Sequence, residues 1–174
     1  MLGNGLRYIL DASVFIEAHR RYYTLDLCPG FWDSIDYYGA QGTLASIDRV
    51  RDEIKEGDRL DQWKSKTPAH FFLSTDTRDV VTAYREVIKW AQGENRLLDA
   101  AKTVFAGDTD AWLVAYTKAR SLTMVTEEVP APNSKASVKI PDACRAFHIP
   151  FMNTFDMLRT LQVSYHWHQP SGAS

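Results

Sequence analysis

Short apolar stretches and amphipathic stretches alternate along the N-terminal part of the chain. The stretch Leu6–Leu10 is predominantly apolar over the length of a strand and ends at Asp11, after which Ser13 can cap a helix that runs to about Arg20. Three more elements, a helix, a strand and a helix, are expected over residues 31–38, 43–46 and 47–56. The first of these helices follows a break at Pro29-Gly30. The order of strand, then helix, therefore occurs twice.

The rest of the chain continues this alternation. Residues 59–105 are expected to be mostly helical, with an amphipathic helix that begins at Asp76 or Thr77 and closes at Gly93. The later elements are a helix opened by residues 107–110, a strand over 122–125, a loop over 129–139, a short helix over 141–147, a strand over 150–152 and a helix over 154–161. Short buried strands that alternate with helices predict an α/β protein with a parallel sheet covered on both faces.

Composition is ordinary for one globular domain: 174 residues, 45% apolar and 24% charged. We expect one domain over residues 1–162 and a C-terminal tail over 163–174. The longest apolar stretch, residues 111–116, is far shorter than a membrane helix, and no secretory signal is evident, so a cytoplasmic protein is expected. Cys28 and Cys144 lack zinc or redox spacing, and Cys144 is expected to be a buried apolar residue.

The charge balance argues against a protein that is held on nucleic acid by charge alone. Lysine and arginine total 20 against 22 acidic residues, and the formal net charge is -2. A nucleic-acid substrate would therefore need a local site, assisted by a metal ion or a partner chain.

Acidic residues stand at the expected carboxyl ends of the strands, where ligands bind in an open parallel sheet. Asp11 follows the first strand, and Glu127 and Glu128 follow the strand that ends at Thr126. Asp110 lies in the first turn of a helix that leads back into the next strand. These carboxylates are expected to lie at the same edge of the sheet.

Glu53, on the helix after the second expected strand, is placed to lean toward the same edge. Converging carboxylates repel one another unless cations lie between them. No histidine or cysteine with zinc spacing accompanies them, so Mg²⁺ or Mn²⁺ is the expected metal.

Each acid also has a purely structural interpretation. Asp11 can cap a helix, and the capping interpretation is favoured for Asp108. Asp110 can act by its interaction with the helix dipole alone. Glu53 lies in a charged run, for which a solvated face is the ordinary explanation.

Four segments together resemble the ordered acid motifs of PIN-domain nucleases, over roughly residues 6–160: Tyr8–Ile16, Val50–Ile54, Asp110–Ala115 and Met124–Glu128. Two later segments, Lys139–Cys144 and Met152–Leu158, resemble the signature of a PIN-like family catalogued as a domain of unknown function. This second signature is the more specific one.

The resemblance implies a three-layer α/β/α sandwich around a short parallel sheet of four to five strands. It implies a Mg²⁺ or Mn²⁺ site and the cleavage of single-stranded RNA. Many small bacterial PIN proteins are toxins of toxin–antitoxin modules, so an antitoxin from an adjacent gene is the implied partner, no membrane is involved, and a homodimer is compatible with the family.

Carried over residue by residue, the resemblance makes Asp11, Glu53 and Asp110 the first three acids and Glu128 or Glu127 the fourth. Ser13, Thr126 and Asp108 would support them. The fourth position departs from the more usual aspartate or asparagine.

Two functions follow. The first is a metal-dependent endoribonuclease, with Arg20, Arg21, Arg49 and Arg51 as candidates for holding the RNA backbone. The second is a PIN-fold protein-binding module with weak or no nuclease activity, which the acidic charge balance and the altered fourth acid favour. The segment His166–His168 is interpreted as part of a frayed tail and not as a metal clip.

Overall fold

A parallel sheet forms the centre of the computed structural model, which describes residues 5–54 and 59–167. Within these ranges, five strands make up the sheet: β1 (Tyr8–Leu10), β2 (Leu44–Ile47), β3 (Phe72–Leu73), β4 (Thr123–Val125) and β5 (Phe151–Met152). Their order is β3-β2-β1-β4-β5, and every neighbouring pair is parallel. The expected α/β class is confirmed, and the strand number lies within the four to five that the resemblance implies.

Strand β1 is the middle strand. Ile9 pairs with Ala45 of β2 on one side and with Met124 of β4 on the other. The residues of β1 and β2 are buried throughout, which fits strands covered by helices on both faces.

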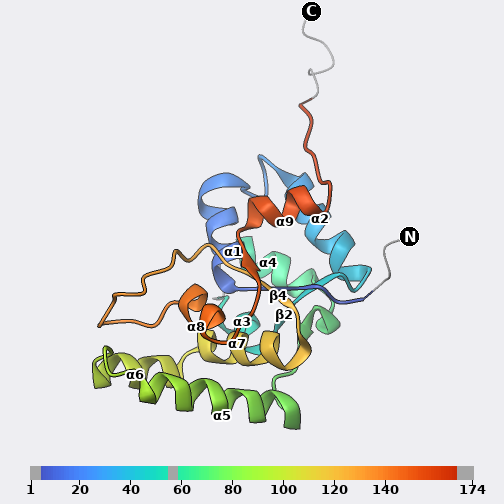
Figure 1. Cartoon of the computed structure of the whole chain (residues 1–174). Helices are drawn as coiled ribbons and strands as arrows, with labels where there is room; N and C mark the ends of the chain where they lie inside the picture. The colour runs from blue at the N-terminus through green and yellow to red at the C-terminus, as the bar shows by residue number, and fades with distance from the viewer. Residues whose placement is uncertain (1–4, 55–58, 168–174) are drawn as a thin grey trace, which may run out of the picture.

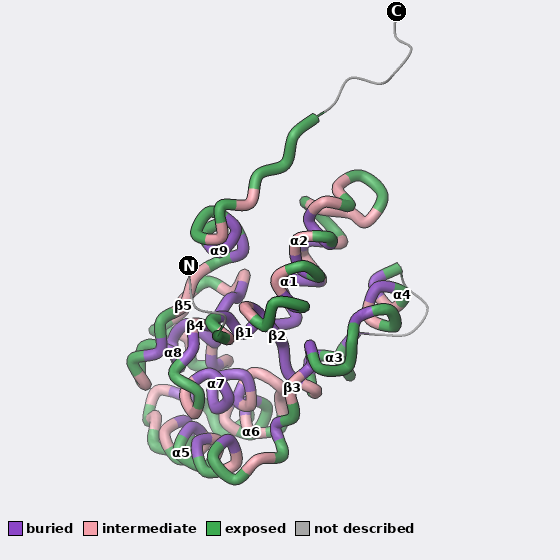
Figure 2. Tube along the Cα trace, turned by 90° about the vertical axis from the view of Figure 1, so that its right-hand side faces the viewer, coloured by how far each residue is buried: buried purple, intermediate pink, exposed green. Residues whose placement is uncertain are grey.

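Helices lie on both sides of the sheet. They are α1 (Ala12–Glu17), a π-helix (Ala18–Tyr22), α2 (Pro29–Ala40), α3 (Asp48–Glu53), α4 (Arg59–Lys66), a 3-10 helix (Ala69–Phe71), α5 (Arg78–Gly93), α6 (Asp99–Gly107), α7 (Thr109–Arg120), α8 (Ile140–Ala146) and α9 (Thr154–Thr160). Figure 2 shows α1, α2 and α9 on one side of the strands and α5, α6 and α7 on the other. This is the expected three-layer arrangement.

The core is continuous through the layers. Leu113 and Val114 of α7 are fully buried with Met124 of β4. On the other side, the ring of Phe15 in α1 lies 5.1 Å from that of Trp63 in α4. Burial of these large apolar side chains holds the helices on the sheet, at roughly 1.5–3 kcal/mol for each side chain.

Two expectations about helix starts are wrong. Helix α1 begins at Ala12, with Asp11 in the N-cap position, so Ser13 already lies inside the helix and does not cap it. Pro29 does not break the chain before α2 but is its first residue, a position where proline fits because the missing N–H would have no helical partner.

The region over 59–105 is mostly helical, as expected, but it also contains β3, which the sequence analysis missed. The strand has two residues and follows a single 3-10 turn, so it shows no alternation. Other elements differ from expectation by a few residues, and the expected end of the third helix at residue 56 lies outside the described residues.

The C-terminal segment is packed as far as Tyr165. The Tyr165 ring lies 5.8 Å from that of Tyr23, and its hydroxyl is 3.0 Å from Ser34 Oγ. Trp167 is exposed, while residues 168–174 of the expected tail lie outside the described residues. None of the helices in the described ranges has the length and apolar character needed to cross a bilayer.

Candidate active site

The strand order reverses at β1, and the predicted acids begin there. The chain moves outward from β1 to β2 and β3, and then returns to the other side of β1 with β4 and β5. The carboxyl ends of β1 and β4 are joined by a hydrogen bond from Asp11 N to Val125 O (2.9 Å). Such a reversal is where open α/β sheets bind ligands.

The Asp11 carboxylate is buried, with 5% of the residue exposed. Its Oδ2 accepts hydrogen bonds from Ser13 Oγ (2.5 Å) and Thr126 Oγ1 (2.8 Å). Burial raises the pKa of Asp11 above its ordinary value, the two hydroxyl groups oppose that shift, and the charge of Glu128 adds to it. The side chain makes no helix-capping hydrogen bond, so capping does not explain this carboxylate.

Asp108 and Asp110, at the start of helix α7, have different roles. Asp108 is the N-cap residue, and its Oδ1 accepts a hydrogen bond from Thr109 N (2.8 Å). Asp110 lies in the first turn of the helix. The predicted capping role of Asp108 is confirmed.

Asp110 has a strongly perturbed carboxyl group. Burial, followed by the charges of four neighbouring carboxylates, raises its pKa from 3.8 to about 8; the four are Asp11, Glu128, Asp108 and Glu53. Acidic residues from three other parts of the chain therefore act electrostatically on Asp110.

Glu53 reaches the site from the last position of α3. Loss of hydration raises its pKa, a side-chain hydrogen bond with Thr109 opposes that change, and the charges of Asp108 and Asp11 reinforce it. The structure thus brings the charges of Asp11, Glu53 and Asp110 together.

The two glutamates after β4 point to different partners. Glu127 Oε1 accepts hydrogen bonds from Thr154 N (2.9 Å) and Thr154 Oγ1 (2.5 Å) at the start of α9. Glu128 is held at the start of α8 by Lys139 Nζ (2.8 Å) and Ile140 N (2.7 Å). The charge acting on Asp11 and Asp110 is that of Glu128.

The supporting residues link these groups. Ser13 Oγ also accepts a hydrogen bond from Glu127 N (3.0 Å), and Thr126 Oγ1 accepts one from Glu128 N (3.1 Å). The hydroxyl groups of Ser13 and Thr126 thereby fix Asp11 relative to the segment after β4.

The carboxylate oxygens of Asp11, Glu53 and Asp110 are ligands of the type that a hard divalent cation prefers. Their side chains, however, do not converge on a common point. Within the described ranges, no lysine or arginine forms an ion pair with Asp11, Glu53 or Asp110. Oxygen ligands with unbalanced negative charge are what Mg²⁺ and Mn²⁺ require. In the same ranges, however, no three histidine, cysteine, aspartate or glutamate side chains converge closely enough to hold a metal ion.

A hollow of about 350 Å³ opens beside the acids, and it is lined by Ser13, Glu17, Arg21, Tyr22, Glu127 and Glu128. Tyr22 is 57% exposed, and its ring meets that of Phe155 edge to face, with centroids 5.7 Å apart. This surface combines hydrogen-bonding groups with an aromatic ring.

The four arginines considered for RNA binding are exposed but differently held. Arg21 pairs with Glu17 (2.9 Å), and Arg49 lies 4.0 Å from the centre of the Trp112 ring and donates to Thr75. Arg51 lies over the ring of Phe72, and Arg20 is exposed beside Arg21.

Lys139 and Thr154 are the site neighbours that the sequence analysis missed. They fix Glu128 and Glu127, respectively. Each lies in one of the two later signature segments, which was the signal that could have found them. Cys144 of the first segment is fully buried, as expected, and burial raises its pKa to about 12.

The strand order and this edge define an α/β protein with a parallel sheet flanked by helices. The crystal structure of FitAcB from Neisseria gonorrhoeae is similar, with a TM-score of 0.50 and 16% sequence identity over 85% of this chain and 98% of that chain. At this identity the likeness concerns the fold. The chain belongs to the family described as "Domain of unknown function (DUF4411)", whose model matches residues 8–165. No curated protein matches it.

Proposed function

We propose that the chain is a metal-dependent endoribonuclease that cleaves single-stranded RNA. The observation that supports this most is that the charges of Asp11, Glu53 and Asp110 act on one another at the point where the strand order reverses. The burial of Asp11, the partial burial of Asp110 and the repulsion among the three carboxylates make this cluster unfavourable without a cation. Holding a cation is the simplest function for such a group.

Asp11, Glu53 and Asp110 would hold Mg²⁺ or Mn²⁺, with Glu128 nearby. When bound, the ion supplies a Lewis acid that activates water and stabilises charge on a phosphodiester. Ser13 and Thr126 keep Asp11 oriented through its Oδ2. Because no three acids already converge, binding would require their side chains to move toward one another.

The hollow beside the acids would receive the RNA strand. The exposed ring of Tyr22 offers a face on which a base can stack, an interaction of about 1–3 kcal/mol for each base. Arg21 lines the same hollow and would contribute positive charge near the RNA backbone. The net charge of -2 makes such local contacts necessary.

As a cellular role, we propose the toxin of a toxin–antitoxin module in the cytoplasm, with an antitoxin encoded by an adjacent gene as its partner. The PIN-like fold and the small size of the chain support this role.

One observation favours the second candidate, a PIN-fold protein-binding module. Both glutamates of the fourth position are already held by hydrogen bonds from α8 and α9, so neither is free. A Mn²⁺ titration separates the two functions, because a module that has lost its metal site would show no saturable binding.

Expression in bacteria tests the proposal as a whole. The wild-type chain should slow growth and cause cleavage of cellular RNA, and co-expression of the adjacent gene should relieve both effects. Asp11→Asn should be harmless, because it removes a metal ligand while keeping the side-chain volume. Asp76→Asn, the same change at an exposed aspartate on the segment after β3, should behave like the wild type. Harmless accumulation of folded wild-type protein would contradict the toxin role.

A further inference from the structure

A short π-helix forms part of the hollow beside the acids. Helix α1 ends at Glu17, and the π-helix Ala18–Tyr22 follows it directly. A hydrogen bond runs from Tyr23 N to Ala18 O (2.7 Å), five residues back along the chain. Such wide turns are rare and are frequent at functional sites. The wider turn brings Tyr22 toward the same side of the helix as Glu17, and both residues line the hollow.

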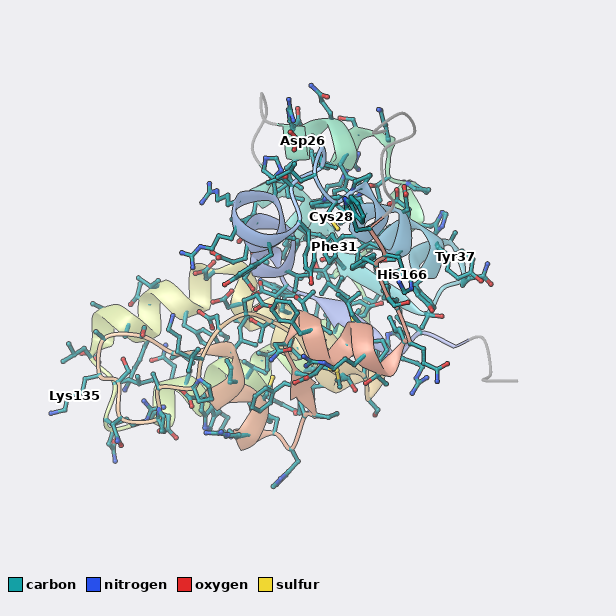
Figure 3. All side chains as sticks on the ribbon, turned by 90° about the horizontal axis from the view of Figure 1, so that it is seen from above. Asp26, Cys28, Phe31, Tyr37, Lys135 and His166 are labelled. Atoms are coloured by element: carbon teal, nitrogen blue, oxygen red, sulfur yellow. The ribbon has the colours of Figure 1, made fainter. Side chains whose placement is uncertain are left out.

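The C-terminal end of the π-helix is fixed by the core. The ring of Tyr23 stacks on that of Phe31, with centroids 4.6 Å apart. Phe31 is fully buried, and Figure 3 shows it within the body of the molecule. The carbonyl oxygen of Tyr23 accepts a hydrogen bond from Trp32 Nε1 (2.7 Å). Tyr22 therefore directly precedes a residue that is held through both its ring and its backbone.

Glu17 and Arg21 form an ion pair in the hollow, between Glu17 Oε2 and Arg21 Nε (2.9 Å). The side chain of Glu17 is 29% exposed and that of Arg21 is 66% exposed, so both can be reached from solution. Within the described ranges, no third residue forms a hydrogen bond or an ion pair with either side chain. Because a carboxylate accepts several hydrogen bonds and a guanidinium has five N–H donors, the pair keeps capacity for a ligand.

The other polar residues of the hollow are already engaged. Ser13 donates to Asp11, Glu127 accepts two hydrogen bonds from the start of α9, and Glu128 is held by the start of α8. The groups that remain to recognise a ligand are the Glu17–Arg21 pair and the exposed ring of Tyr22.

A carboxylate next to a guanidinium presents two acceptors followed by donors. Guanine is the RNA base with the complementary edge, because its N1–H and N2 amino groups are adjacent donors and its O6 is an acceptor. Adenine, cytosine and uracil do not place two donor groups side by side. Unpaired bases in single-stranded RNA are commonly read on this edge while they stack on an aromatic ring.

We propose that Glu17, Arg21 and Tyr22 form a subsite that selects guanine in the RNA strand. This inference rests on the proposed function. Glu17 accepts hydrogen bonds from N1–H and the N2 amino group, Arg21 donates to O6, and the base stacks on the Tyr22 ring. The hollow of about 350 Å³ is within the size range of small-molecule sites and can accept one base.

The ion pair argues against a cationic ligand at Glu17. An arginine side chain of a partner protein also presents parallel N–H donors to a carboxylate. Arg21, however, already supplies the cationic partner of Glu17, and it would repel a second guanidinium. A neutral base meets no such repulsion.

The test is the binding of labelled oligouridylates that carry one test base, measured by fluorescence anisotropy at low ionic strength in EDTA. The wild type should bind the guanine oligonucleotide at least about tenfold more tightly than the adenine one. Inosine keeps N1–H and O6 but lacks the N2 amino group, so its oligonucleotide should bind with intermediate affinity. A hollow that only stacks bases would not distinguish inosine from guanine.

Two variants separate reading of the base from stacking. Glu17→Gln replaces one acceptor with a donor and should reduce the preference for guanine over adenine to within about twofold. Tyr22→Leu should weaken both oligonucleotides by similar factors, because stacking does not depend on the base. The loss of an exposed ion pair costs little stability, so Glu17→Gln should remain folded, as urea denaturation can verify.

The matched control is Glu86→Gln, which also removes the charge of an ion-paired glutamate. Glu86 pairs with Lys118 and lies on α5, on the other side of the sheet from α1 (Figure 2). This variant should keep the guanine preference of the wild type.

The outcomes distinguish this inference from the proposed function. RNA that binds without preference among guanine, inosine and adenine, together with metal-dependent cleavage, would overturn the guanine subsite alone. A guanine preference that persists in Glu17→Gln would also overturn it. If no oligonucleotide binds while an arginine peptide does, the hollow is a protein-binding site, and both the subsite and the RNA substrate are contradicted.

Discussion

Asp110 makes the folded protein sensitive to pH. Its carboxyl loses a proton near pH 4 in the unfolded chain and near pH 8 in the folded one. Between these values the folded state binds a proton that the unfolded state lacks, so the free energy of unfolding falls as the pH rises, by up to about 1.4 kcal/mol for each pH unit. Asp110→Asn should reduce this decline in metal-free protein, as measured by urea unfolding in EDTA at about pH 5 and about pH 8.5. Part of the decline should remain, because the pKa values of Asp11 and Glu53 are also raised in the folded protein.

Asp108→Ala is the comparison for this prediction. It removes the cap of α7 and should lower stability by about 1 kcal/mol at both pH values while keeping the decline. A decline in Asp110→Asn as steep as in the wild type would show that another group is responsible.

The roles of Asp108 and Asp110 could be distinguished from the sequence, because the capping position and the first-turn position differ by a fixed spacing along a helix. It could not separate Glu127 from Glu128. Which of them faces the acids depends on contacts with Lys139 and Thr154, distant in the sequence. The capping role expected for Ser13 is wrong because its hydroxyl group donates to Asp11 Oδ2 and accepts a hydrogen bond from Glu127 N, after β4.

At the scale of elements, the close contact between α2 and the 3-10 helix requires a glycine. A Cβ at Gly39 would lie 2.7 Å from Cδ2 of Phe71, whose ring is buried in the core. Gly39→Ala should therefore lower the free energy of unfolding by about 1–3 kcal/mol, measured by urea denaturation.

Gly93→Ala is the matched control, because Gly93 ends α5 and nothing lies within 4 Å of its Cβ position. It should be neutral or stabilise by up to about 1 kcal/mol. If both alanine variants are equally stable, the two helices are not in the close contact described.

Elements with a regular spacing of apolar residues could be predicted from the sequence. Elements that depend on pairing with distant residues could not. Helix α5 follows its apolar spacing, whereas β3 has two residues and exists because it pairs with Ser46 and Ile47 of β2. A strand of that length has no detectable pattern of its own.

At the scale of the whole molecule, the apolar pattern predicts a parallel sheet but not the order of its strands. The order β3-β2-β1-β4-β5 arises from long-range pairing, and it is this order that brings the residues after β1 and β4 together. Figure 1 shows the long connection from β4 to α8, which carries Lys139 back to the same edge. The site is thus a property of the assembled sheet more than of any single segment.

The central claim is that the acids at this edge cleave RNA with the help of a divalent ion. The most direct measurement is the initial rate of cleavage of a labelled single-stranded RNA by purified, partner-free protein as Mn²⁺ is added. Wild type and Asp108→Ala should cleave in a saturable, Mn²⁺-dependent manner that EDTA abolishes, and Asp110→Asn should lose at least about a hundredfold in rate. Equal rates for Asp110→Asn and the wild type, or cleavage that persists in EDTA, would contradict the account.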